Sequence, residues 1–123
     1  MARTLAKSTL KRLRALLESE QERLSRMIEE YEQELEEARL TETSSDRSPD
    51  PGSAEAGSLK FEYEKELSLE RNAVDLLRKV EDALRRIDNG TYGVCEVCGG
   101  PIPVARLEVL PYAATCVNCA RKA

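Results

Sequence analysis

The chain has 123 residues, of which 34% are charged and only 4% are aromatic. This length suits one domain, or one small domain carried on an elongated support, and the composition favours the second because long solvent-exposed helices need little aromatic core. The net charge of −4 argues against bulk nucleic-acid binding as the function.

The first forty residues predict one long helix. Between Leu10 and Ala38, apolar residues recur mostly in steps of three, four or seven, and the stretch contains neither Gly nor Pro. We expect a helix from about Thr4 to about Arg39, roughly 50 Å long at 1.5 Å per residue. Its start, residues 1–14, carries five basic and no acidic side chains, whereas residues 15–40 carry nine glutamates and three arginines.

Residues 41–57, TETSSDRSPDPGSAEAG, predict a turn-rich connection. They hold four Ser, two Thr, two Pro and two Gly, a composition that favours turns and opposes helix continuation. Four acids, including Asp50 and Glu55, stand against one arginine. We therefore expect an acidic loop at about 41–57.

A second helical pattern follows the connection. Apolar residues at Leu69, Ala73, Leu76, Val80, Ala83 and Ile87 alternate steps of four and three. The helix could begin near Ser58, and it is expected to stop at Asp88-Asn89-Gly90 because Asn and Gly adopt the left-handed conformation that ends helices. Two such helices predict an antiparallel hairpin whose tip is the connection. Pairing between two chains is the open alternative.

All four cysteines lie in the last 29 residues, as Cys95, Cys98, Cys116 and Cys119. Two Cys-x-x-Cys pairs separated by seventeen residues supply the tetrahedral set of four thiolates that zinc accepts at about 2.3 Å per bond. Gly99 and Asn118 are expected to tolerate the tight turns, and the prolines between the pairs favour extended or turned backbone over helix. We expect one structural Zn²⁺ in a closed site.

Three other uses of the cysteines stay open. Disulfides would suit a secreted chain, but no secretion signal is visible. A redox-active dithiol normally needs one Cys-x-x-Cys in a βαβ setting, and an iron–sulfur cluster normally has different spacing. Each of these fits less well than a zinc ion.

The predicted fold class is therefore all-α, a long antiparallel coiled-coil hairpin over residues 1–90 followed by a small C4 zinc-ribbon-like module over 91–123. No apolar run approaches the roughly 20 residues that span a bilayer, so we expect a cytoplasmic protein without membrane contact. No histidine is present, and no glycine-rich phosphate loop or open metal position is visible. An enzyme is not expected.

Residues 61–120 resemble the C-terminal half of the DksA/TraR group of bacterial C4-type zinc-finger proteins. The specific stretches are "IDNGTYGVCEVCGGPIPVARLEVLPYA" and "AEAGSLKFEYEKELSL". The resemblance implies a non-catalytic transcription regulator that binds core or holoenzyme RNA polymerase, and the intramolecular hairpin favours a monomer. Its coiled-coil tip would enter the secondary channel of the polymerase, without sequence-specific DNA binding.

The resemblance also marks the tip as the place where this chain departs from the family pattern Asp-x-x-Asp-x-Ala. The matching stretch is Gly52 to Gly57, in which Glu55 stands at the second acid. Gly52 replaces the first acid, which Asp50 could supply from two residues away, and Gly57 replaces the alanine. We expect Asp50 and Glu55 to be the partner-binding acids.

Two other functions compete with polymerase binding. A zinc ribbon can bind nucleic acid, but residues 91–123 carry only three basic side chains beside two acids. A homodimeric coiled-coil scaffold with zinc at its ends would use the same apolar seams.

Overall fold

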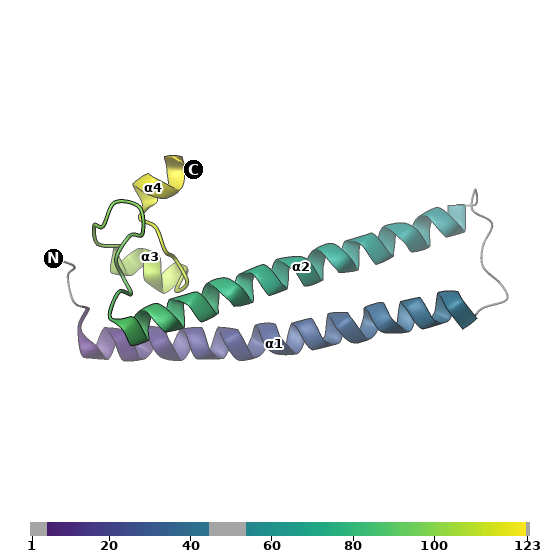
Figure 1. The fold of residues 1–123 in the computed structure, drawn as a ribbon, viewed down its shortest axis with the longest axis horizontal. Helices are drawn as coiled ribbons and strands as arrows, with labels where there is room; N and C mark the ends of the chain where they lie inside the picture. Colours follow the sequence, from purple (N-terminus) through teal and green to yellow (C-terminus); the bar gives the residue numbers. More distant parts are fainter. Residues whose placement is uncertain (1–4, 45–53, 123) are drawn as a thin grey trace. The chain divides into compact units, whose positions relative to one another are not determined.

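A computed structural model describes residues 5–44 and 54–122 of the chain. Four helices follow one another: α1 Lys7–Ser44, α2 Ala54–Asn89, α3 Val104–Val109 and α4 Val117–Lys122 (Figure 1). Among the described residues there is no strand, only one isolated antiparallel bridge between Val94 and Pro101. The predicted all-α class with a small C-terminal module is confirmed.

The two long helices extend further than the sequence indicated. α1 continues to Ser44 instead of ending near Arg39, and α2 begins at Ala54 instead of near Ser58. The reason is local, because the prolines of the connection lie at 49 and 51, and Ala54-Glu55-Ala56 are strong helix formers. Of the predicted loop at 41–57, residues 41–44 and 54–57 are helical, and residues 45–53 lie outside the described residues.

The chain divides into two compact units. Met1–Arg23 and Leu77–Ala123 form the first, here called the cysteine unit, and Leu24–Leu76 form the second, here called the acidic unit. The predicted boundary near residue 90 coincides with the end of α2, whereas the units divide within α1 and α2. Separate domains at 1–90 and 91–123 therefore stay a prediction.

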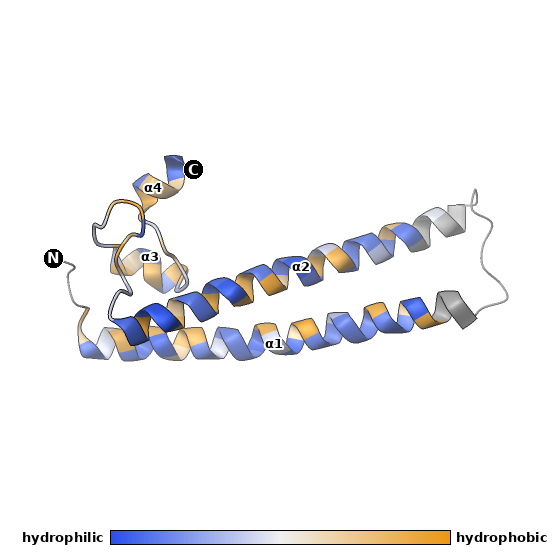
Figure 2. Cartoon of the chain, viewed as in Figure 1, coloured by the Kyte–Doolittle hydropathy of each residue, from blue (hydrophilic) through white to orange (hydrophobic). Residues whose placement is uncertain are grey.

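In the acidic unit, α1 and α2 run antiparallel and share a narrow apolar seam (Figure 2). Leu24, Leu35 and Ala73 are buried there. The seam prediction is wrong for Leu69, whose exposed fraction is 39%, because the half-buried stripe passes through Leu67 and its neighbours instead. Most other described surface residues of this unit are polar, although Leu40 and Phe61 are also exposed.

In the cysteine unit, residues 7–23 of α1 and 77–89 of α2 pack against the C-terminal module. The fully buried side chains Leu13 and Leu17 come from α1, Val80 from α2 and Leu107 from α3. Arg14 of α1 also forms an ion pair with Asp88 at the end of α2, at 2.6 Å. Three helices thus contribute to one core.

The end of α2 is where the sequence placed it. Gly90 has φ of +78°, the left-handed conformation expected after a helix, and its N–H donates to the carbonyl of Ile87 at 3.2 Å. Asn89 remains helical. The chain then turns directly into the first cysteine pair.

Helix α3 corrects the expectation that prolines keep the segment between the cysteine pairs free of helix. Pro103 is the N-cap residue of α3, with φ of −57° and ψ of 139°, and Pro111 follows its C-cap Leu110. Proline at these places costs no helical hydrogen bond. The prolines bound the helix, and Leu107 inside it is fully buried.

Candidate metal centre

The four cysteines come together in the cysteine unit. Their Sγ atoms all lie within 4.8 Å of one another, and those of Cys98 and Cys116 are 3.8 Å apart. A disulfide would require about 2.05 Å between sulfurs, and all four cysteines are free. A tetrahedron with Zn–S bonds of about 2.3 Å has S···S edges of about 3.8 Å. The separations therefore fit a single ion bound by all four sulfurs.

The first cysteine pair is shaped by a tight backbone turn. The N–H of Cys95 donates to the carbonyl of Gly100 at 2.8 Å, and the N–H of Gly99 donates to the carbonyl of Cys95 at 3.0 Å. Gly99 has φ of +73°, as the sequence predicted. Side chains disfavour this conformation, so glycine closes the turn without strain.

The second pair is built differently. Cys116 immediately precedes α4, which contains Cys119, and the N–H of Ala120 donates to the carbonyl of Cys116 at 3.0 Å. The expectation of a positive φ at Asn118 is wrong, because Asn118 lies inside α4 and no described non-glycine residue has a positive φ. A helical turn brings these two thiols to the same side instead.

The thiol pKa values differ in a way that suits a cation. The backbone N–H of Cys98, followed by that of Cys116, lowers the pKa of Cys95 to about 6, and the N–H of Cys119 lowers the pKa of Cys116. Hydrogen bonds to Cys116 and Cys95 raise the pKa of Cys119 to about 12. The protein alone thus favours some thiolates but not all four. A dication at the centre supplies the missing charge compensation.

Contacts around the cysteines hold the two pairs together. The N–H of Glu96 donates to the carbonyl of Ala114 at 2.9 Å, and Nε of Arg106 donates to the carbonyl of Thr115 at 2.9 Å. The hydroxyl of Tyr92, a side chain only 5% exposed, donates to the carbonyl of Pro111 at 2.7 Å. All three contacts end on the segment just before Cys116.

These outer contacts were not predicted from the sequence. Nor was the position of a further residue, Arg86, which lies near the end of α2 with its side chain only 13% exposed. A signal did exist, because Arg86 follows the buried Ala83 by three residues and so shares its face of the helix. The acceptors of its guanidinium, however, come from loops whose path has no periodic signal.

The two predicted tip acids lie outside what the structure describes. Asp50 falls within residues 45–53, and of Glu55 only the helical backbone, in the first turn of α2, is described. Their role stays a prediction.

None of the helices in the described part of the chain combines the length and the apolar composition of a membrane span.

Residues 90–123 match the model of the prokaryotic dksA/traR C4-type zinc finger. The uncharacterized protein YteA of Bacillus subtilis is 49% identical over 55 residues, which cover 45% of this chain and 23% of YteA. The RNA polymerase-binding transcription factor DksA of Haemophilus influenzae is 34% identical over 71 residues, which cover 58% of this chain and 48% of DksA. The chain thus spans less than half the length of these curated relatives.

The solved structure of transcription factor DksA2 from Pseudomonas aeruginosa extends the likeness to the fold. It matches with a TM-score of 0.76 at 27% identity, covering 94% of this chain and 83% of DksA2. Both the helices and the cysteine module therefore have a counterpart. Residues 90–123 are thus similar to the DksA/TraR C4-type zinc finger, and the four clustered cysteines match a cofactor of one structural zinc ion.

Proposed function

We propose that this protein is a non-catalytic transcription regulator that binds RNA polymerase. The observation that carries the proposal is the likeness to DksA, a transcription factor named for polymerase binding, in sequence around the cysteines and to DksA2 in fold over 94% of the chain. The zinc ion has a structural role in this proposal, because four thiolates leave no coordination position for water or substrate.

Cys95, Cys98, Cys116 and Cys119 are the proposed zinc ligands. Their sulfur separations support this assignment, and bound zinc would hold together a small module whose own core is limited. With the ion in place, the module fixes the N-terminal part of α1 and the C-terminal part of α2 in one core. The zinc module thereby holds these parts of the two helices in place for contact with a partner.

The acidic unit is the proposed polymerase-facing part. It carries fifteen acidic and six basic side chains, whereas the cysteine unit carries eight acidic and thirteen basic ones. Such a charge excess favours a basic partner surface and speeds association at low salt. Entry of the tip into the secondary channel, with Asp50 and Glu55 at the contact, is the finer form of the proposal.

Co-purification with core polymerase tests the binding, and in vitro transcription tests the tip. We expect Glu55→Lys to change transcript yield while zinc content stays at one ion per chain. Glu81→Lys is the matched control, because Glu81 is an exposed acid on the same helix but in the cysteine unit. Equal transcript yields from the two variants and the unchanged protein would contradict the role of the tip.

Nucleic-acid contact is the second candidate, and the basic excess of the cysteine unit favours it. Arg12 and Arg14, however, already form ion pairs with Glu108 and Asp88. Filter binding against salt separates the candidates, because phosphate contacts give an affinity that falls steeply as salt rises. We expect no binding to duplex DNA at physiological salt.

A further inference from the structure

The zinc site is assembled from two segments that must be held in register. Seventeen residues separate the cysteine pairs, and each pair forms its own local turn. We propose that Arg86 is a positioning residue for the zinc site, whose guanidinium joins both cysteine segments to the end of α2. The inference rests on the ligand assignment made under Proposed function.

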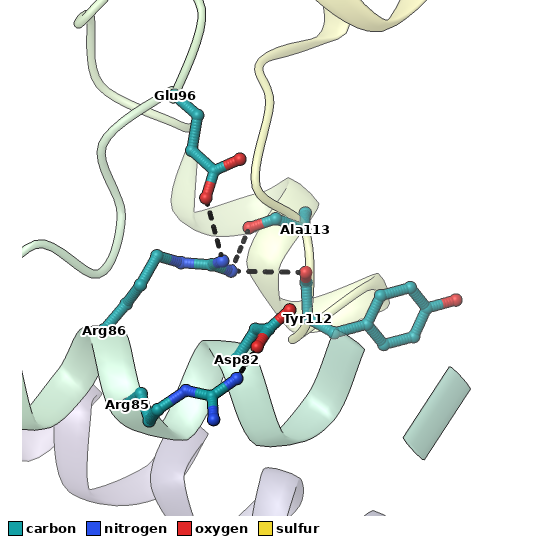
Figure 3. Close-up of polar contacts among 6 residues, drawn as sticks. All are labelled: Asp82, Arg85, Arg86, Glu96, Tyr112 and Ala113. Atoms are coloured by element: carbon teal, nitrogen blue, oxygen red, sulfur yellow. Dashed lines mark hydrogen bonds and ion pairs between the residues drawn. The ribbon is translucent and has the colours of Figure 1, made fainter. Parts of the chain in front are cut away.

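The side chain of Arg86 reaches both segments at once (Figure 3). Nη1 donates to Oε1 of Glu96 at 3.3 Å, and Glu96 lies between the two cysteines of the first pair. Nη2 lies 3.4 Å from the carbonyl of Tyr112 and 3.5 Å from that of Ala113, shortly before the second pair. One guanidinium therefore spans the two halves of the site.

The main chain of Arg86 is fixed as well. Its carbonyl accepts the N–H groups of Thr91 at 2.9 Å and Tyr92 at 3.1 Å, the residues that lead into the first cysteine pair. With only 13% of the side chain exposed, little water competes for the guanidinium. The last turn of α2 is thus connected to the zinc module through both the backbone and the side chain of one residue.

The neighbouring Arg85 provides a natural comparison. Its side chain is 67% exposed and forms an ion pair with Asp82 of the same helix, as Figure 3 shows. It thus pairs along its own helix, whereas Arg86 contacts the module. The two arginines have the same charge and adjacent positions, so they differ mainly in what the guanidinium contacts.

Arginine suits this bridging task better than lysine. The planar guanidinium presents several donors in a fixed fork and stays charged, whereas an ammonium is a compact point charge on a flexible stem. A lysine at this position keeps the charge but loses the fork that joins Glu96 to the Tyr112 and Ala113 carbonyls. Arg86→Lys therefore separates bridging from charge.

The experiment measures zinc retention in the full chain by transfer of Zn²⁺ to a colorimetric chelator. Residues that hydrogen-bond to metal ligands typically contribute 10- to 100-fold to metal affinity. Arg86 contacts the segments that carry the ligands and not the ligands themselves, so we expect Arg86→Met to weaken zinc retention by about 10-fold, the lower end of that range. Arg86→Lys should remain closer to Arg86→Met than to the unchanged protein. Zinc retention in Arg85→Met should differ from that of the unchanged protein by less than about twofold, because the ion pair of Arg85 is exposed.

A spectroscopic measurement adds a readout that helix stability alone would not change. With Co²⁺ in place of Zn²⁺, the visible absorption bands report the geometry of the four sulfurs. We expect these bands to shift in Arg86→Met and to stay unchanged in Arg85→Met. Unchanged zinc retention and bands in Arg86→Met, or complete restoration of both by Arg86→Lys, would overturn the bridging role.

A second variant keeps the test valid if Arg86→Met fails to fold. Glu96→Gln leaves Arg86 in place but removes the charge of one acceptor, and we expect a smaller loss of zinc retention in the same direction. Zinc retention equal to that of the unchanged protein would then overturn the inference. Failure of the unchanged protein to bind one zinc ion would instead overturn the ligand assignment itself.

Discussion

The cysteine unit and the acidic unit contain parts of the same two helices but obtain their order from different sources. Of the buried core side chains in the described residues, nine lie in the cysteine unit and three, Leu24, Leu35 and Ala73, in the acidic unit. Among the described residues, the four-cysteine cluster and the buried Leu107 of a third helix both lie in the cysteine unit. Helix pairing alone thus provides a thin seam, and dense packing requires the module.

The two units carry opposite excesses of charge, which agrees with the proposal that the acidic unit faces the polymerase. Acidic side chains predominate in the acidic unit and basic ones in the cysteine unit. Because few positions of the acidic unit are buried, most of its positions can carry charged side chains, and its many glutamates are available for recognition by a partner surface. Four substitutions or sets of substitutions test how the two units differ in packing and in dependence on the metal.

The largest expected effect is loss of the metal. In Cys98→Ser the weaker ligand should abolish one-to-one zinc binding, and structural zinc sites contribute on the order of 10 kcal/mol to the folding of small domains. Elemental analysis and circular dichroism measure the outcome. We expect the C-terminal module to unfold while the helices of the acidic unit persist. Val97→Ser is the control, because Val97 is its neighbour and is 72% exposed. Retention of a full zinc equivalent would contradict the role of Cys98.

The next effect concerns the cores of the two units. Leu17 in the cysteine unit is fully buried, so Leu17→Ala should lower the free energy of unfolding by about 2 to 5 kcal/mol. Leu35→Ala in the acidic unit should cost less, because Leu35 is 9% exposed and its surroundings can collapse more readily. Denaturant titration of the zinc-loaded protein measures both. Leu16→Ala, at a position 44% exposed, is the control. A greater loss from Leu35→Ala would reverse the comparison.

A smaller effect is expected at Tyr92. Tyr92→Phe removes the hydrogen bond to the Pro111 carbonyl and should cost about 1 kcal/mol. Burial raises the pKa of Tyr92 to about 12 from its ordinary 10.0. The folded chain's preference for the protonated phenol adds fully to the free energy of unfolding below pH 10. This contribution is lost as the pH rises through about 12, because the phenol of the unfolded chain releases its proton at a lower pH than that of the folded chain. The free energy of unfolding, measured between pH 9 and pH 12, should therefore decrease less steeply with pH in Tyr92→Phe than in a Tyr31→Phe control.

The smallest expected effect is a gain of stability in the acidic unit. Gly57 is exposed within α2, and a Cβ there would meet no atom within 4 Å. Gly57→Ala should stabilise the helix by about 0.5 to 1 kcal/mol, since glycine loses more backbone freedom on folding. Thermal unfolding and zinc content measure the result. Gly90→Ala should have the opposite sign, because Gly90 has φ of +78°.

The sequence by itself determined the two helices, the helix end at Gly90 and the grouping of the cysteines. These features depend on local signals: apolar periodicity, a left-handed glycine and two Cys-x-x-Cys pairs. Such signals are readable because each requires only residues a few positions apart. They did not identify Leu69 as exposed, since a stripe of leucines does not specify which one meets the partner helix.

Only the tertiary structure decided what lies between and around those features. It placed a helix between Pro103 and Pro111, and it distinguished the buried Arg86 from the exposed Arg85. Spacing places Arg86 on the same helix face as the buried Ala83 but does not identify its acceptors, because these are ten or more residues away in the sequence. Arg85, in contrast, pairs with Asp82 on its own helix. Long-range packing assigns each arginine its acceptors, and the zinc module gives Arg86 acceptors that the helix alone would not provide.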